Sequence, residues 1–436
     1  MTHPQLPVAV IGAGPVGLTA AAHLVSRGIE PIVFEAGDAV GASMREWAHV
    51  RVFSPWEFNV DPTAAELLAK SGWIAPAARA YPTGGEIVDG YLEPLAAVPA
   101  IAERLHVSAR VVAVTRLGID KLKDAGREEA PFELIVERDG VEEHHFARAI
   151  IDASGTWTRP NPLGAGGLPA VGERAHAHRI VYGIPDVLTA DRARYAGRRV
   201  LVVGSGHSAF NAILDLATLR EQEPETEIVW AIRSGDPMPS FGGGRADELP
   251  ARGALGQAVR SLVYDGAVEL ITGFQTTGVG THDAALILTD GERRIVVDEV
   301  IAATGFRPDI ALLGELRLDL DDRVEAPRAL APLIDPNIHS CGSVPPHGVD
   351  ELSHPDPDVY VVGMKSYGRA PTFLLRTGYE QVRSVVAALA GDWESARQVE
   401  LVLPETGVCS GPSNDPPVAA ACCGSDREGE LVADAA

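Results

Sequence analysis

Residues 8–35 read VAVIGAGPVGLTAAAHLVSRGIEPIVFE, and this stretch decides the fold of the chain. Four apolar residues at its start are typical of a buried parallel strand. The pattern G-x-G-x-x-G follows, and a run of small and apolar residues then predicts a helix that ends near Gly28. A second apolar run ends in Glu35. Together these parts are typical of a dinucleotide-binding unit, whereas the glycine pattern alone would also fit an ordinary turn.

Each residue of this loop has a separate physical task. Gly12 allows a tight turn, Gly14 lets the backbone approach a diphosphate, and Gly17 lets helix and strand pack closely. The helix that begins near Pro15 presents free N–H groups to the anion. Glu35 can accept hydrogen bonds from ribose hydroxyls, and its charge favours FAD or NAD over a coenzyme with a 2′-phosphate. We therefore predict that these residues bind a dinucleotide.

Length and charge limit the classes of protein to consider. The chain has 436 residues, enough for two or three domains, and its apolar content of 46% is ordinary for a globular protein. A net charge of -23 argues against binding to nucleic acids or to an anionic membrane surface. We see neither a secretory signal nor a membrane-spanning run, and four cysteines do not make a disulfide scaffold in so long a chain. We therefore expect a cytoplasmic protein.

A second dinucleotide unit begins at residue 200. The strand-like VLVV leads into GSGHSA, and a helical run follows. The next strand ends in Arg233 rather than in an acid, and arginine can pair with a 2′-phosphate, so this unit favours NADP. The predicted contacts of that coenzyme include Gly204, Gly206 and Ser208. His207 either meets the diphosphate or is a solvated turn residue.

The two halves repeat one pattern, which indicates duplication of the nucleotide-binding unit. Each half has an Asp-Gly hairpin signal, at residues 139–140 and 290–291, and ends in a strand followed by ASG or ATG. We predict an α/β fold of two Rossmann-like, three-layer ββα domains. The expected boundaries are 1–172 and 331–400 for a discontinuous FAD-binding domain, 173–330 for an NADP-binding domain, and 401–436 for a disordered, cysteine-containing tail.

Further cofactor contacts are expected where backbone or flat side chains can approach a ring. The loop after Glu35 contains GASMREW, in which Arg45 and Trp47 could pair with a flavin or cover it. A surface loop with one buried tryptophan is the alternative. Other candidate cofactor contacts follow or lie within strand-like segments, and they are Val111, Gly155, Gly305 and Gly363.

With these motifs the chain resembles flavoproteins that have two dinucleotide-binding domains, and among them the flavin-containing (class B) monooxygenases. The resemblance rests on GAGPVG with Glu35, GASMREW, GERAH at 172–176, GSGHSA with Arg233, and ATGFRPD at 303–309. It implies that NADPH reduces FAD and that reduced FAD reacts with oxygen. It further implies that the resulting C4a-hydroperoxide oxygenates a soft nucleophile.

The resemblance also provides three candidates for catalysis. His176 ends a segment similar to the family's F-x-G-x-x-x-H signature, in which Ala170 replaces the phenylalanine. Lys365 and Tyr367 follow the late strand, where other flavoproteins of this kind have Gly-Asp and this chain has Gly-Met. These two residues face flavin or substrate, or else belong to a polar loop. Ser54 stands where many relatives place an asparagine beside the flavin.

The cysteines leave a second function open. A disulfide or metal reductase would keep a cysteine pair beside the flavin, and neither glycine loop has a cysteine nearby. Cys409, Cys422 and Cys423 lie in the tail, where three thiolates suit a soft metalloid such as trivalent arsenic. Incidental cysteines in an unstructured tail are the alternative. The tail and the segment KSYGRAPTFLL also resemble flavoproteins of arsenic-resistance operons.

The sequence therefore predicts an NADPH-dependent FAD monooxygenase that acts on a small soft nucleophile. Trivalent or methylated arsenic is one hypothesis for the substrate, and molecular oxygen is the expected co-substrate. One alternative is an NADPH-dependent reductase that passes electrons through Cys422 and Cys423. Another is a redox-sensing binding protein without enzymatic activity.

Overall fold

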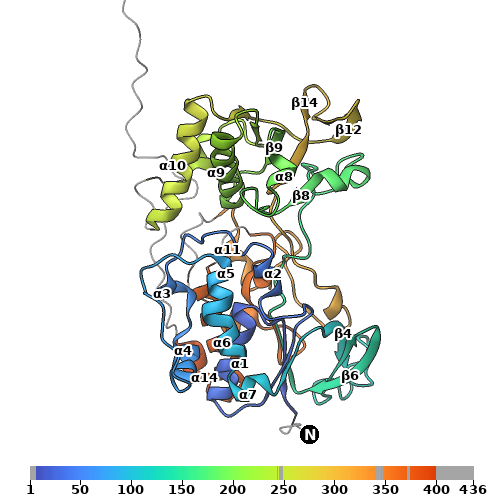
Figure 1. The fold of residues 1–436 in the computed structure, drawn as a ribbon. Helices are drawn as coiled ribbons and strands as arrows, with labels where there is room; N and C mark the ends of the chain where they lie inside the picture. The colour runs from blue at the N-terminus through green and yellow to red at the C-terminus, as the bar shows by residue number, and fades with distance from the viewer. Residues whose placement is uncertain are drawn as a thin grey trace, which may run out of the picture.

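The computed structural model describes residues 6–242, 244, 249–338, 345, 347–370 and 374–398. Figure 1 shows two lobes, which we call the first and the second unit. The first unit contains the N-terminal part of the chain and, beside it, the C-terminal part. The second unit contains the middle of the chain. The first unit is therefore discontinuous in sequence, as predicted.

A parallel five-stranded sheet forms the centre of the first unit, in the order β16-β7-β1-β2-β3. Its strands are β1 (Val8–Ile11), β2 (Pro31–Phe34), β3 (Leu105–His106), β7 (Ala149–Asp152) and β16 (Val359–Val361). Every residue of β1 and β7 is buried. Valine and isoleucine dominate these strands because both faces of the sheet are covered.

Helices cover one face of this sheet, and an antiparallel sheet covers the other. Helix α1 (Pro15–Ser26) packs against α13 (Leu375–Leu389), and their apolar side chains share one core. The antiparallel sheet has β4 (Arg110–Arg116), β5 (Phe132–Arg138) and β6 (Val141–Ala147), and it shares a second core with β1 and β16. The shorter helices are α2 (Ala42–Arg45), α3 (Trp56–Asn59), α4 (Pro62–Ala69), α5 (Gly84–Ile87), η1 (Val88–Leu92), α6 (Glu93–Ala96), α7 (Pro99–Ala102), α11 (Ala331–Ile334), α12 (Val349–Leu352), η6 (Gly363–Tyr367) and α14 (Trp393–Arg397).

The second unit repeats this architecture. Its parallel sheet has the order β11-β10-β9-β15-β8 and its antiparallel sheet the order β12-β13-β14. The strands are β8 (Ile180–Tyr182), β9 (Arg199–Val203), β10 (Glu227–Ala231), β11 (Glu269–Ile271), β12 (Gly278–His282), β13 (Ala285–Thr289), β14 (Arg294–Val297) and β15 (Glu299–Ala302). The helices are η2 (Arg174–Arg179), α8 (Arg192–Tyr195), α9 (His207–Gln222), η3 (Met238–Phe241) and α10 (Pro250–Tyr264). The short η5 (Ala311–Leu313) follows β15 and packs against β4 of the first unit. The predicted pair of three-layer ββα units is thus confirmed.

The packing of the two connections bears on the boundaries between the units. Leu163 and Ala170 are buried in the core beneath β12–β14, so the entering connection packs with the second unit. Leu313 and Leu316 are buried in the core of the first unit beside β4 and β5. The chain therefore packs with the first unit well before residue 331. We propose boundaries near residues 160 and 306.

Two further features concern the C-terminal part. Helix α13 begins at Leu375, because Leu374 still has extended backbone angles. Residues 371–373 and 399–436 lie outside the described residues, and so do Cys341 and the predicted tail with Cys409, Cys422 and Cys423.

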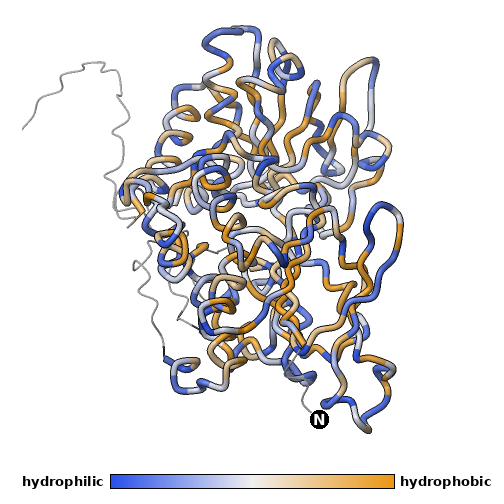
Figure 2. Tube along the Cα trace, turned by 60° about the horizontal axis from the view of Figure 1, so that its bottom comes forward, coloured by the Kyte–Doolittle hydropathy of each residue, from blue (hydrophilic) through white to orange (hydrophobic). Residues whose placement is uncertain are grey.

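Figure 2 shows apolar residues along the strands inside both lobes and hydrophilic residues on the outer loops.

Candidate functional site

The first glycine loop lies at the carboxyl end of β1, where its backbone is closely packed. Gly12 has φ +99°, and a Cβ atom there would come within 2.8 Å of the Ala153 carbonyl oxygen. A Cβ atom on Gly17 would lie 1.9 Å from the Gly12 carbonyl oxygen. The tight turn predicted at Gly12 and the close approach predicted at Gly17 are therefore present.

Open space lies beside Gly14, in contrast to its two neighbours. A Cβ atom on Gly14 would have no heavy atom within 4 Å. Gly14 is also the N-cap of α1, and Pro15 occupies the first helical position. The free N–H groups of the first turn favour an anion at such a position. The loop thus has room and polarity for the diphosphate of a dinucleotide.

Glu35 is fixed beside this loop by two backbone donors. Its Oε2 accepts a hydrogen bond from the Ala13 N–H at 2.7 Å, and its Oε1 accepts one from the Gly37 N–H at 2.8 Å. The segment that leads to Val111 lies beside Glu35, because the backbone N–H of Ala109 donates to the Glu35 carbonyl oxygen at 2.8 Å. Val111 is buried in β4. The placement of Glu35 and Val111 fits the ribose and adenine end of FAD.

The second glycine loop repeats this geometry at the carboxyl end of β9. Gly204 has φ +131°, and a Cβ atom there would lie 2.2 Å from the Ala303 carbonyl oxygen. Gly206 has open space around it and is the N-cap of α9. Ala209, which replaces the third glycine, is fully buried. Ser208 lies in the first turn of α9, where the free N–H groups favour an anion.

Arg233 lies two residues beyond the end of β10, and its side chain is available to a ligand. The residue is exposed, and its Nη1 donates to the Ala165 carbonyl oxygen at 3.3 Å. Ser234 follows it, with its Oγ donating to the Asp236 carbonyl oxygen at 2.7 Å. This position next to the carboxyl edge of the sheet is where a dinucleotide-binding unit contacts the adenosine ribose.

Aromatic side chains connect the two units at the junction. Trp157 follows β7 and Phe306 follows β15, and their rings stack with centroids 4.5 Å apart. Trp47 approaches Trp157 at 6.5 Å, and Trp157 Nε1 donates to the Glu46 carboxylate at 2.8 Å. Gly155 (φ +70°) and Gly305 (φ +82°) precede the two stacked rings. The two strand ends expected to reach a flavin therefore meet at one place.

The segment around Phe53 in the first unit also approaches the second glycine loop across the junction. The Phe53 ring belongs to the first unit, and its centroid lies 4.9 Å from that of His207 in the second loop. The Arg252 guanidinium lies 5.9 Å from the Phe53 centroid on the α10 side. Sequence reasoning assigned no role to Phe53 or Arg252, because nothing local in the chain marks a contact between units. His207 is therefore part of the junction rather than a fully solvated turn residue.

The flavin-side loop uses its charged residue within the first unit. Arg45 Nη2 donates to Glu93 at 2.6 Å, and Arg45 Nε donates to the Val40 carbonyl oxygen at 3.1 Å. The Trp47 ring lies on Gly84, where a Cβ atom would come within 2.7 Å of it. The Arg45 guanidinium is therefore occupied by a carboxylate, whereas Trp47 lies at the junction as described above. Their roles toward a cofactor stay predictions.

Lys365 forms a buried ion pair. Its Nζ donates to Asp152 Oδ2 at 2.6 Å and to Ser154 Oγ at 3.0 Å, and the Lys365 side chain is only 1% exposed. Asp152 is the last residue of β7, and its Oδ1 accepts a hydrogen bond from the Ser154 hydroxyl group at 2.6 Å. The η6 turn that carries Lys365 begins at Gly363, where a Cβ atom would lie 3.2 Å from Val16 in α1. Lys365 therefore connects β7, η6 and the region of the first glycine loop.

The other two catalytic candidates lie in different surroundings. Tyr367 is buried at the end of η6, and burial raises the pKa of its hydroxyl above the ordinary value for tyrosine. His176 lies on η2 in the second unit, and its Nδ1 is 2.9 Å from the Gly172 carbonyl oxygen. Lys365 and Tyr367 thus share one turn, and His176 is on another unit. No described contact joins His176 to the other two.

A buried polar network beside η6 was not anticipated from the sequence. Gln381 Oε1 accepts the Gly363 N–H at 2.7 Å, and Gln381 Nε2 donates to Ser366 Oγ at 2.9 Å. The same nitrogen lies 2.8 Å from His347 Nε2. Burial lowers the pKa of His347, which favours the neutral ring that can accept this bond. The network holds η6 against α13.

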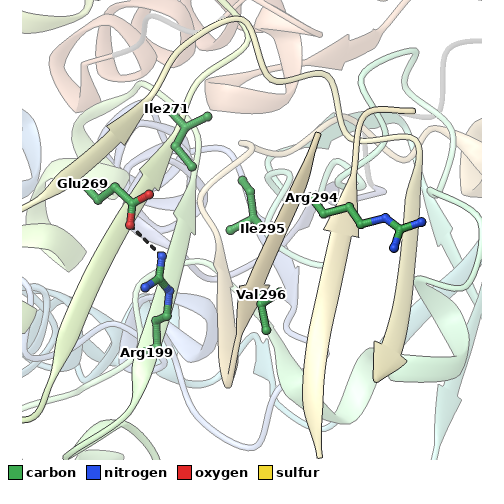
Figure 3. Close-up of a pocket in the computed structure, with 6 residues that line it drawn as sticks. All are labelled: Arg199, Glu269, Ile271, Arg294, Ile295 and Val296. Atoms are coloured by element: carbon green, nitrogen blue, oxygen red, sulfur yellow. Dashed lines mark hydrogen bonds and ion pairs between the residues drawn. The ribbon is translucent and has the colours of Figure 1, made fainter. Parts of the chain in front are cut away.

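An open hollow of about 420 Å³ lies elsewhere on the second unit (Figure 3). Arg199 and Glu269 face each other there at 2.6 Å, and each is the first residue of its strand. The hollow therefore lies at the amino edge of the parallel sheet. Dinucleotides bind at the carboxyl edge of such sheets, so this hollow is not the predicted coenzyme site.

A half-buried carboxyl group lies where the first unit meets α9. Burial raises the pKa of Asp215 to about 6; the charge of His49, from the first unit, acts against this rise, and that of Asp186 adds to it. Because the folded pKa is above the unfolded value, stability is lost as the pH rises from about 4 to about 6. Asp215→Asn should therefore raise the free energy of unfolding by about 2 kcal/mol at pH 8.

Chemical denaturation at a series of pH values checks this expectation. The exposed Asp265→Asn is the matched control and should change little. An equal gain in both variants, or no gain above pH 6 in Asp215→Asn, would contradict the assignment.

The comparison with known families decides the class of the protein. A sequence profile described as pyridine nucleotide-disulphide oxidoreductase matches residues 9–329. The chain belongs to the pyridine nucleotide-disulphide oxidoreductase family. The predicted enzyme class, an FAD-dependent oxidoreductase that uses NADP, is confirmed by this membership. The redox-sensing protein without enzymatic activity is therefore not supported.

Individual relatives of this oxidoreductase are both reductases and monooxygenases. Ferredoxin–NADP reductase 1 of Cupriavidus metallidurans is 25% identical over 72% of this chain and 75% of the relative. A flavin-containing monooxygenase of Aspergillus flavus is 27% identical over 53% of this chain and 54% of the relative. The bacillithiol disulfide reductase of Bacillus cereus has the same fold, with a TM-score of 0.65 at 20% identity over 88% of this chain and 99% of that one. The resemblance to flavin-containing monooxygenases is thus confirmed, and the arsenic-operon type stays a prediction.

The described residues of the oxidoreductase offer neither a membrane span nor a metal cluster. Within the described residues, the helices are too short or too polar to cross a bilayer. Over the same part of the chain, His, Cys, Asp and Glu form no group of three or more that could hold a metal ion. The predicted metalloid ligands of the tail are outside that part, so their role stays a prediction.

Proposed function

We propose that the protein is an NADPH-dependent FAD monooxygenase that oxygenates a small soft nucleophile. The observation that supports this most is the junction where the first unit meets the second glycine loop, in which the described residues include no cysteine. Phe53 of the first unit contacts His207 of the second glycine loop, and the first cysteine of the chain is Cys341, which lies outside the described residues. A disulfide reductase needs a thiol pair beside its flavin, and the described residues of this junction provide none.

The proposed roles of the chain's own residues follow from the geometry. Gly12 and Gly14 would accept the FAD diphosphate, with Glu35 on the ribose. Gly206 and Arg233 would hold NADPH, with Arg233 on the 2′-phosphate. FAD, when bound, supplies hydride acceptance and oxygen activation. The aromatic residues of the junction would exclude water from the space between the two cofactors. The oxygenating flavin species implied by the resemblance stays a prediction.

The substrate hypothesis is trivalent or methylated arsenic, supported by the resemblance of the tail and of KSYGRAPTFLL. Its test is the rate of NADPH oxidation by the FAD-loaded protein in the presence of methylarsenite, a sulfide or an amine. Stimulation by methylarsenite, with an oxygenated arsenic product, is expected. Stimulation by the sulfide or amine alone would contradict the arsenic hypothesis and leave the monooxygenase in place.

A reductase is the second candidate, favoured by the ferredoxin–NADP and bacillithiol disulfide reductases among the relatives. Under that function Cys422 and Cys423 would pass electrons onward. Replacing both by serine should then abolish turnover and leave reduction of the flavin by NADPH intact. Unchanged turnover in the double variant would exclude this route.

Coenzyme choice tests the role of Arg233. Arg233→Ala should raise the KM for NADPH by roughly tenfold or more, because a charge-assisted contact to the 2′-phosphate is lost. The KM for NADH should hardly change, since NADH lacks that phosphate. Steady-state kinetics with both coenzymes measure this difference. An equal effect on the two KM values would show that Arg233 does not contact the 2′-phosphate.

A further inference from the structure

Arg159, Arg307 and Arg369, from separate parts of the chain, lie around the connection that enters the second unit. Arg307 belongs to the ATGFRPD motif, and its Nη2 donates to the Gly167 carbonyl oxygen at 3.2 Å. Arg369 follows η6, the turn that carries Lys365 and Tyr367. A Cβ atom built on Gly167 would lie 3.7 Å from Arg307 Nη2 and 4.0 Å from Arg369 Nη1. Two guanidinium groups therefore converge on one point above Gly167.

The charges at this point do not balance. Arg369 is paired with Glu325 at 2.7 Å, and Arg159 lies 3.7 Å from Asp309. Arg307 donates only to neutral oxygens, the Asn161 side-chain oxygen at 2.7 Å and the Gly167 carbonyl. Among the described residues, Arg307 has no carboxylate within ion-pair distance. The cluster thus carries one uncompensated positive charge.

The pKa of Arg307 agrees with the presence of one uncompensated positive charge. Burial and then the neighbouring Arg369 charge lower the pKa of Arg307, and Glu325 acts in the opposite direction. Two like charges held together are unfavourable unless an anion lies between or beside them. Gly167 has φ +81° and adds no side chain to the space where the guanidinium groups meet. A small anion could therefore reach both arginines.

We propose that Arg307 and Arg369 form an anion-binding site at the junction that takes the carboxylate of a small soft nucleophile, a substrate class that is an alternative to the arsenic compounds, which have no carboxylate. The planar guanidinium fork matches a carboxylate, and two forks from different segments would fix its orientation. The adjacent Leu168 is 75% exposed and offers an apolar surface beside the charge. That the anion is the substrate rests on the proposed function, but the anion site itself does not.

A matched pair of ligands tests the site. (Methylthio)acetate carries a soft sulfur and a carboxylate, and its methyl ester has the same sulfur without the charge. Binding to the FAD-loaded protein is measured by calorimetry, with saturating NADP to occupy Arg233. The acid should bind about tenfold more tightly than the ester. Arg307→Gln and Arg369→Gln should each remove most of this preference, and Glu325→Gln should increase it because it frees Arg369.

Control variants separate the possible outcomes. Arg397→Gln, an exposed arginine paired with Asp350, should keep the preference. Equal binding of acid and ester by the native protein, or a preference that survives both arginine variants, would overturn the site. A preference that disappears with NADP and with Arg233→Ala would place the anion at the coenzyme site and would also overturn it.

Kinetics then distinguish this site from the proposed function. If the acid binds through Arg307 and Arg369 but neither ligand is oxygenated, the site stands and monooxygenation of such a sulfide fails. If both ligands are oxygenated with equal KM, the monooxygenase stands and the anion site fails.

Discussion

Gly14→Ala should fold normally and fail to retain FAD, whereas Gly17→Ala should fold poorly. A Cβ atom on Gly14 meets nothing within 4 Å of the protein, and its backbone angles (φ -79°, ψ -173°) suit alanine. The added methyl would instead occupy the space into which a diphosphate must come. A Cβ atom on Gly17 would lie 1.9 Å from the Gly12 carbonyl oxygen, so helix α1 would have to move away from β1.

The two variants therefore separate binding from folding. We expect Gly14→Ala to weaken FAD binding by roughly a hundredfold with little change in the stability of the apoprotein. Gly17→Ala should lower the free energy of unfolding by about 3 kcal/mol or more. The flavin-to-protein absorbance ratio and thermal unfolding of the apoprotein measure the two effects. Full FAD retention by Gly14→Ala would show that the diphosphate does not approach this loop.

Removal of the Lys365 ammonium is expected to have the second large effect. Lys365→Met leaves the carboxylate of Asp152, which is fully buried, without its cation. Breaking one side of a buried ion pair typically costs about 3–5 kcal/mol. Asp152 would keep only its hydrogen bonds from Ser154. We therefore expect a large loss in the free energy of unfolding, measured by denaturant titration.

A second substitution shows whether the loss comes from the unpaired charge. Lys365→Met combined with Asp152→Asn removes both charges and keeps an acceptor for Ser154, so it should recover much of the lost stability. Lys70→Met removes an exposed lysine and should change the free energy of unfolding by less than about 0.5 kcal/mol. A double variant no more stable than Lys365→Met would contradict the importance of the pair.

The glycine loops were predictable because their requirements are local. Gly12 and Gly204 need positive φ and closeness to the next strand, and the sequence shows both the glycines and the strands around them. The same holds for the duplication, since each unit repeats a strand, a glycine loop and a hairpin within a short stretch. Local patterns therefore fixed the fold class and the order of the units.

The partners of Lys365 were not predictable, because Asp152 lies 213 positions away along the sequence. Nothing near either residue marks the other, so Lys365 was assigned to catalysis when its visible contacts are with Asp152 and Ser154. The contact between Phe53 and His207 was missed for the same reason. The ASG motif after β7 was a usable signal, since its serine and the preceding aspartate form one side of the Lys365 site.

The sequence predicts that the second unit ends at residue 330, whereas we propose from the packing that it ends near residue 306, and this difference has another physical reason. Leu313 ends the short helical turn η5 and Leu316 lies just beyond it, and so short a segment has no periodic pattern that shows which core it enters. Only the packing against β4 and β5 reveals that this segment belongs with the first unit.

Reoxidation of the reduced protein is the most direct test of the proposed monooxygenase. The FAD-loaded protein is reduced with NADPH and mixed with oxygenated buffer in a stopped-flow spectrometer. We predict a transient absorption band distinct from oxidised and reduced FAD, which lasts longer when NADP is present. Direct return to the oxidised spectrum with release of hydrogen peroxide, with or without NADP, would contradict the monooxygenase and favour the reductase.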